Sequence, residues 1–168
     1  MPGELIAELI DRYPVLNSCR DSVGEAFRLL EACYERDGIV YLCGNGGSAA
    51  DAEHIVGELM KSFAFKRSIP ASDRQEVNDE VISANLEGAL RAISLTGHLS
   101  LTTAFANDVH PGMAFAQQVY GYGRKGDVLW ALSTSGNSEN VLHALTVARA
   151  RGLNCIGMTG QKGGAMRE

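Results

Sequence analysis

The sequence predicts an α/β fold with a doubly wound parallel sheet, helices on both faces and further helices at the N-terminus. Short, mostly apolar segments at 39–43, 92–95, 127–132 and 154–158 are typical of strands buried inside a parallel sheet. Segments with helical periodicity at 48–62, 111–120 and 138–151 lie between them. Glycine and small polar residues follow several of the strands, where the chain turns into a helix. Strands that alternate with helices in this way favour a parallel sheet.

The length fits one domain. The 168 residues, 45% hydrophobic and 21% charged, can bury a core without help from disulfides or metals. We expect a single domain over 1–168, with N-terminal helices in 1–36 and an α/β core in 37–168. Apolar stripes at helical spacing in 4–12 and 18–36 predict a partner surface, for which a second copy of the chain is the simplest occupant.

Composition argues against several classes of function. The net charge is −5, and no cluster of Lys and Arg predicts a nucleic-acid surface. No apolar run approaches the roughly 20 residues of a membrane span, and the first residues lack a signal-peptide pattern. We therefore expect a cytoplasmic protein without nucleic-acid or membrane partners. The four cysteines have irregular spacing without a CxxC pair, so buried, inert thiols are expected.

Two regions fit the pattern less well. Residues 64–88 have weak periodicity and predict a long excursion with a helical piece near 76–84. The segment 163–168 resembles the start of a helix, so we expect a closing strand and helix to follow Glu168.

Two small-residue turns carry the strongest functional signal. Gly44–Ser48 offers unobstructed backbone amides, and Ser133–Ser138 offers four hydroxyls at a helix N-terminus. Both turns follow strands, and ligands of open parallel sheets bind beyond the carboxyl ends of strands. A phosphate there would meet oriented amides and the positive end of a helix dipole. Such residues also cap helices that bind nothing, which is the alternative interpretation.

A nucleotide site is less well supported. Gly44-x-Gly46-x-x-Ala49 matches a loose dinucleotide pattern, but the segment 64–67 lacks the acidic residue that would bind the ribose. No Gly-Lys-Ser/Thr follows either turn, which argues against a nucleoside-triphosphate loop.

His54 and Glu58 are four residues apart on the helix that follows the first turn, so they share a face. Together they could bind a metal, or Glu58 could act as a general base beside a sugar. They could also belong to an ordinary solvated face with Asp51 and Lys61, and two ligands do not complete a zinc site.

These motifs resemble the phosphoheptose isomerase family of the SIS domain superfamily. The resemblance rests on Leu42–Ser48 with Asp51-Ala52, on His54-x-x-x-Glu58-Leu59, and on Gly126–Leu129 followed by Ser133–Ser138. Asn107-Asp108 and Thr159-Gly160 also fit the family pattern.

The resemblance implies a SIS-type fold and a cytoplasmic homotetramer with sites at subunit interfaces. The implied reaction is the isomerisation of sedoheptulose 7-phosphate to D-glycero-D-manno-heptose 7-phosphate through an enediol, toward ADP-heptose for lipopolysaccharide. His54 and Glu58 would bind one Zn²⁺ per subunit, and Glu58 would be the catalytic acid/base. The remaining zinc ligands, a glutamine and a histidine on a final helix, are expected beyond Glu168. The implied substrate-binding residues are Asn45, Gly46, Gly47, Ser48, Glu58, Asn107, Asp108, Ser133, Thr134, Ser135 and Ser138.

Two other functions remain open on the sequence. One is a non-catalytic SIS module that binds a phosphosugar or a protein as a regulator. The other is a dinucleotide-binding oxidoreductase, which rests on the Gly44/Gly46/Ala49 pattern alone.

Overall fold

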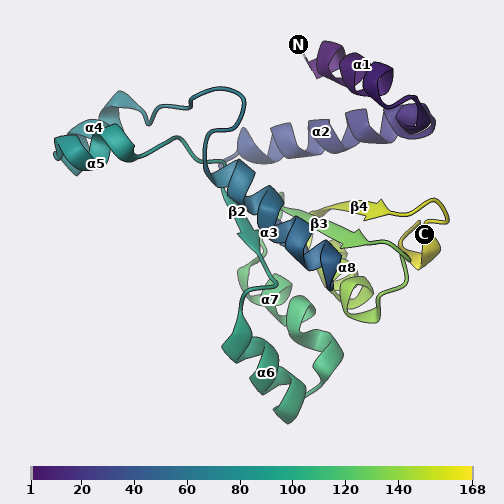
Figure 1. Cartoon of the computed structure of the whole chain (residues 1–168). Coiled ribbons are helices and arrows are strands. Elements are labelled where there is room, and N and C mark those ends of the chain that lie inside the picture. The colour runs from purple at the N-terminus through teal and green to yellow at the C-terminus, as the bar shows by residue number, and fades with distance from the viewer. Residues whose placement is uncertain (1, 168) are drawn as a thin grey trace.

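A four-stranded parallel sheet forms the centre of the computed structural model, which describes residues 2–167 (Figure 1). The strands are β1 (Val40–Cys43), β2 (Ala92–Ser94), β3 (Val128–Ser133) and β4 (Asn154–Thr159), in the order β2-β1-β3-β4. Every pairing is parallel, as the sequence predicts. Met1 and Glu168, the outer bounds of the expected domain, lie outside the described residues.

Two hydrophobic layers sandwich the sheet. On one face α7 (Ala114–Tyr122) and α8 (Glu139–Arg151) pack against Tyr41, Cys43 and their neighbours. On the other face α2 (Arg20–Tyr34) and α3 (Gly47–Met60) pack against Val40 and Leu42. Alternate residues of β1 therefore serve opposite layers, and all four of its side chains are buried. This arrangement confirms the doubly wound fold class.

Of the two N-terminal helices, α2 packs on the sheet and α1 lies beyond it (Figure 1). The helix α1 (Pro2–Arg12) leads through the 3₁₀ turn η1 (Pro14–Cys19) into α2, and α1 packs against α2 (Figure 1). Apolar side chains remain open to solvent here, including Leu5 and Val15, which are 64% and 82% exposed. The apolar stripe expected from the sequence is therefore only partly covered within one chain.

The excursion between α3 and β2 contains two short helices where the sequence predicts one near 76–84. These are α4 (Ala71–Val77) and α5 (Glu80–Asn85), which project from the body of the molecule (Figure 1). The first helix ends before the second begins because Asn78, which follows α4, takes a left-handed conformation with φ of 46°. Asp79 then caps α5, since its carboxylate accepts a hydrogen bond from the Ile82 amide at 2.9 Å.

The remaining segments complete the layers. The apolar stretch after β2 is the helix α6 (Leu99–Asp108). Pro111 opens the short turn η2 (Pro111–Met113) that leads into α7, and η3 (Gly164–Arg167) ends the described chain. Among residues 2–167, no helix combines the length and apolar character needed to cross a membrane.

Candidate functional site

The two small-residue turns lie at one edge of the sheet. β1 and β3 are adjacent and parallel, with Cys43 paired to Ala131, so both strands end at the same edge. The chain then enters α3 after the first turn and α8 after the second. Two helix N-termini, each with amides that lack an intrahelical acceptor, therefore face the carboxyl edge of the sheet.

The first turn is built closely around its glycines. A Cβ at Gly44 would lie 2.7 Å from the Ser48 carbonyl oxygen, so only glycine lets the backbone pass. Gly46 has a φ of 56° and precedes the first residue of α3, where no side chain caps the helix. The amide of Ser48 donates to the Asn45 carbonyl at 3.0 Å, which closes the turn.

The second turn gathers its hydroxyls around the start of α8. The Oγ atoms of Ser133 and Ser138 are 2.9 Å apart, and Ser133 is buried. Ser138 stands at the N-cap of α8 without making a side-chain cap hydrogen bond. The Ser135 hydroxyl accepts a hydrogen bond from the Asn137 amide at 3.1 Å. Hydroxyls and N-terminal amides that converge in this way suit an anion such as a phosphate.

The segment after β4 supports this turn from outside. The amides of Gly160 and Met166 donate to the carbonyls of Thr134 and Gly136, both at 3.0 Å. Gly136 has a φ of 67°, and a Cβ there would collide with the Gly163 carbonyl oxygen. The turn is therefore fixed by a contact that sequence analysis missed, for which the only signal was the Gly163-Gly164 pair.

A pair of amide side chains joins the first turn to the start of α8, directly after the second turn. The Nδ2 atom of Asn45 donates to Asn140 Oδ1 at 2.8 Å, and Asn140 Nδ2 donates to Asn45 Oδ1 at 2.9 Å. Asn45 was expected from the sequence at the site, whereas Asn140 was not. The two residues are 95 positions apart, so no local pattern links them.

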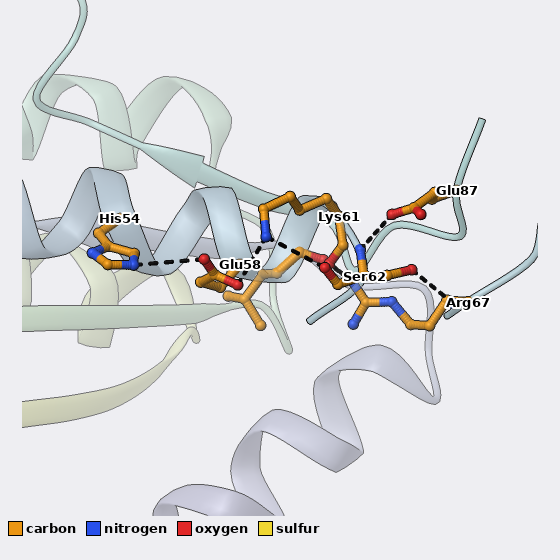
Figure 2. Close-up of polar contacts among 7 residues, drawn as sticks. His54, Glu58, Lys61, Ser62, Arg67 and Glu87 are labelled. Carbon is orange, nitrogen blue, oxygen red and sulfur yellow. Dashed lines mark hydrogen bonds and ion pairs between the residues drawn. The ribbon is translucent and has the colours of Figure 1, made fainter. Parts of the chain in front are cut away.

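His54, Glu58 and Lys61 form a polar trio near the end of α3 (Figure 2). The Nε2 atom of His54 lies 3.5 Å from Glu58 Oε1, and Lys61 Nζ lies 3.1 Å from Glu58 Oε2. Glu58 is the least exposed of the three side chains, at 31%. The expected shared face of His54 and Glu58 is therefore present, with Lys61 on the second carboxylate oxygen.

This trio is far from the two turns of its own chain. Glu58 comes eleven residues after Gly47, which corresponds to about 16 Å along the helix axis. The carbonyl of Leu59 accepts a hydrogen bond from the Leu90 amide, just before β2 begins, so α3 ends near the amino edge of the sheet. Within one chain, the structure does not bring Glu58 together with Ser133–Ser138.

Asn107 and Asp108 stand at the end of α6, where Asn107 Nδ2 donates to Asp108 Oδ1 at 2.7 Å. The chain then passes through Gly112, whose carbonyl oxygen lies 3.3 Å from His143 Nδ1 on α8. Asn107 and Asp108 therefore lie a few residues from a segment that contacts α8, but no hydrogen bond joins them to either turn in residues 2–167.

The donors of His54 and Glu58 fit a zinc ion as a pair, because imidazole nitrogen and carboxylate oxygen are ordinary zinc ligands and their side chains already converge. In residues 2–167, no group of three His, Cys, Asp or Glu side chains is placed to hold a metal. Of the zinc ligands expected from the sequence, His54 and Glu58 are the two that lie among the described residues.

A hollow of about 1090 Å³ lies at the opposite, amino edge of the sheet. Its lining includes Arg36, Arg124 and Arg151, which lie at or just beyond the C-termini of α2, α7 and α8. Arg36 Nε donates to the Ala32 carbonyl at 2.9 Å. Positively charged side chains at a helix C-terminus interact favourably with the free carbonyl oxygens there. This structural role accounts for the three arginines. We therefore place the candidate site at the carboxyl edge.

The expectation of buried cysteines is confirmed for Cys33 and Cys43, whereas Cys19 and Cys155 are only partly buried. Burial raises the pKa of the Cys43 thiol to about 12, and burial also raises the pKa of Cys155. A thiol that stays protonated at neutral pH is a poor nucleophile and metal ligand. Cys43 is the last residue of β1 and directly precedes the first turn. Its thiol therefore contributes to the packing of the core and not to the chemistry of the site.

Comparison with known proteins identifies the family. A model described as "SIS domain" matches residues 7–73 and 84–160, which covers most of the chain and leaves out the centre of the α4–α5 excursion. The chain belongs to the SIS domain family. The dinucleotide interpretation has no support in the fold, because the segment 64–67 forms no strand.

Similar curated proteins identify a more specific family within the SIS domain family. The chain is 43% identical over 127 residues to "Phosphoheptose isomerase" of Synechocystis, matching 76% of this chain and 55% of that protein. It is 40% identical over 158 residues to "Phosphoheptose isomerase" of Rhodospirillum rubrum, matching 94% of this chain and 73% of that protein. The chain thus also belongs to the phosphoheptose isomerase family, although it spans 55–63% of the length of several relatives.

Solved structures agree with this placement. A phosphoheptose isomerase from Neisseria gonorrhoeae superposes with a TM-score of 0.71 at 32% identity, covering 98% of this chain and 74% of that one. One from Francisella tularensis superposes with a TM-score of 0.75 at 28% identity, covering 98% and 76%.

Proposed function

We propose that the protein is an aldose–ketose isomerase that converts sedoheptulose 7-phosphate to D-glycero-D-manno-heptose 7-phosphate. The observation that carries this proposal is the hydroxyl-lined turn Ser133–Ser138 at the start of α8, beside the glycine turn Gly44–Ser48. Both turns stand in a chain that belongs to the phosphoheptose isomerase family.

The second turn would hold the phosphate. Hydroxyls of Ser133, Thr134, Ser135 and Ser138 and the first amides of α8 can donate to its oxygens. Hydroxyl donors add no full charge, so the grip stays reversible. Gly46, Gly47 and Ser48 would contact the sugar from the first turn, with Asn107 and Asp108 as further polar groups, as the family resemblance implies.

Glu58 would move the proton. The carboxylate takes a proton from C1 of the ketose while the C2 carbonyl oxygen is protonated, which gives an enediol. The carboxylate then returns its proton to C2 while the C1 hydroxyl loses its proton and becomes the aldehyde oxygen, so one proton passes in total from the C1 oxygen to the C2 oxygen. The reaction is a balanced isomerisation without an external oxidant. Fixing the phosphate limits the positions that C1 and C2 can take. Less orientational freedom then has to be lost before the proton is transferred, which lowers the entropic part of the barrier.

The distance between the two groups supports a site shared between copies of the chain. About 16 Å of helix separates Glu58 from the first turn, whereas a seven-carbon sugar phosphate spans about 10 Å at ordinary bond lengths. A second copy could bring its own Glu58 to the turns, and the exposed apolar side chains of α1 and α2 offer a surface for association. We propose the homotetramer of the family as this assembly.

His54 and Glu58 would hold a zinc ion together with ligands outside the described residues. The bound ion would polarise the carbonyl oxygen and stabilise enediolate charge. A zinc analysis of the full-length protein should give one Zn²⁺ per subunit, and His54→Ala should lower that content. An unchanged content in His54→Ala would remove His54 from the ligand set.

The reaction itself is tested with the full-length protein, zinc and sedoheptulose 7-phosphate. We expect an aldose heptose phosphate as product, and Glu58→Gln should lower kcat by about 10²- to 10⁴-fold. Glu25→Gln, an exposed residue on α2, serves as the matched control and should keep full activity. Absence of turnover, or full activity in Glu58→Gln, would contradict the proposal. Binding without turnover would favour a regulatory SIS module.

The setting of the reaction is part of the same proposal. We place it in the cytoplasm, as the family resemblance implies. The product would serve ADP-heptose synthesis for surface glycans, as the resemblance implies.

A further inference from the structure

The reciprocal amide pair between Asn45 and Asn140 links the first turn to the start of α8. The ladder between β1 and β3 ends at Cys43 and Ala131, before either turn begins. In residues 2–167, the two Asn45–Asn140 hydrogen bonds are the only ones that cross between the turns. Without them, no hydrogen bond would tie the first turn to the start of α8, while the second turn would keep its support from the segment after β4.

A third hydrogen bond fixes the orientation of both amides. The amide of Val141 donates to Asn140 Oδ1 at 3.0 Å, and a backbone N–H can donate only to the oxygen of a side-chain amide. The oxygen of Asn140 therefore faces Val141 and the Nδ2 of Asn45. This leaves Asn140 Nδ2 to donate to the oxygen of Asn45, so the pair forms in one arrangement.

The pair also limits what Asn45 can offer a ligand. Its oxygen already accepts from Asn140, and one of its two N–H groups already donates. One N–H and one lone pair of the Asn45 oxygen remain for a substrate. Asn45 can therefore serve the site mainly by holding Gly46 and Gly47, the residues that follow it at the start of α3.

We propose that Asn140 is a positioning residue that sets the spacing between the phosphate turn and the sugar-contacting turn. This inference rests on the proposed function for its ligand, while the pair itself is a contact within the chain. A sugar phosphate spans both turns and depends on their spacing. Inorganic phosphate occupies the second turn alone and does not.

A double-mutant cycle separates this role from simple capping. Asn140→Ala removes both the pair and the Val141 contact, whereas Asn45→Ala removes the pair and leaves the Val141 contact in place. We expect Asn140→Ala to weaken sedoheptulose 7-phosphate about tenfold and inorganic phosphate by less than about threefold. In the Asn45→Ala background, Asn140→Ala should have no further effect.

Amide hydrogen exchange gives a readout that needs no ligand. Exchange at 46–48 should accelerate to a similar extent in Asn45→Ala and Asn140→Ala. Thr146→Ala, which removes only a hydrogen bond to the Leu142 carbonyl further along α8, should leave it unchanged.

The outcomes are distinct. Equal weakening by Asn140→Ala in both backgrounds, or unchanged exchange at 46–48, would overturn the positioning role. If the wild-type protein binds no sugar phosphate, the proposed function fails, and the exchange measurement alone decides whether the pair positions the first turn.

Discussion

The carboxyl-edge turns and the polar end of α3 differ in how completely a single chain builds them. At the turns, glycines fit against neighbouring carbonyls, and Ser133 and Ser138 bond each other. At the end of α3, His54, Glu58 and Lys61 lie on an open face, with His54 77% exposed. A phosphate site needs a preformed backbone, whereas a proton-transfer group can be supplied by another copy. On the proposed function, one chain would carry the complete phosphate turn and only half of the reaction centre.

The strongest test of the finished turn is Gly136→Ala. A Cβ would meet the Gly163 carbonyl, and alanine disfavours the positive φ, so we expect a loss of about 2–4 kcal/mol in the free energy of unfolding. Denaturant unfolding measures this loss. Gly57→Ala is the matched control because its Cβ would meet nothing within 4 Å in the middle of α3, and it should stabilise the protein slightly. Equal stability of the two variants would show that the turn is not tightly packed.

The next effect concerns the phosphate. Ser138→Ala removes a hydroxyl that Ser133 contacts at 2.9 Å, and hydrogen bonds to charged groups are worth about 1.5–3 kcal/mol. We expect phosphosugar affinity to fall by one to two orders of magnitude with little change in kcat. Ser72→Ala, on the projecting α4, should have no effect. A drop in kcat alone would move Ser138 from binding to chemistry.

The smallest effect is a pH response near the polar end of α3. Glu87 accepts a hydrogen bond from the Ser62 amide at 2.7 Å, and this bond lowers the pKa of Glu87 below its ordinary 4.5 (Figure 2). A lowered folded-state pKa contributes stability above the unfolded pKa, and this contribution is lost as the pH falls through the folded value. Proteolysis of 63–86 should therefore accelerate below about pH 4.5 but stay constant from pH 5 to 7.

Glu87→Gln should remove most of this pH response, while Glu76→Gln on α4 should leave it intact. Because Glu87 is exposed, we expect a change in local cleavage rate rather than in global stability. An identical pH profile in Glu87→Gln would show that another group holds the base of the excursion, for example Arg67, which donates to the Gly88 carbonyl at 2.8 Å.

The regular part of the fold could be predicted because its signals are local. Each residue of β1 is apolar and buried, and Gly44 follows where the chain must turn tightly. The face shared by His54 and Glu58 follows from helical spacing alone. These features need no knowledge of distant segments.

The remainder depends on contacts between segments far apart in sequence. The Asn45–Asn140 pair and the close approach of Gly163 to Gly136 arise only when β1, β3 and the end of the chain are assembled. Asn78 separates α4 from α5 because it takes a left-handed conformation. Asparagine tolerates this conformation, but its presence in a sequence does not predict it. The separation between Glu58 and the turns likewise depends on the direction in which α3 runs from the sheet, which the sequence alone does not show.

The most direct test of a shared centre is subunit complementation. Glu58→Gln and Ser138→Ala full-length chains are unfolded together, refolded as a mixture and assayed with subsaturating sedoheptulose 7-phosphate beside each variant refolded alone. If one copy supplies the turn and another the carboxylate, mixed assemblies contain some intact sites, so the mixture should exceed the average of the two separate activities. A mixture that only matches that average would contradict a site built between copies.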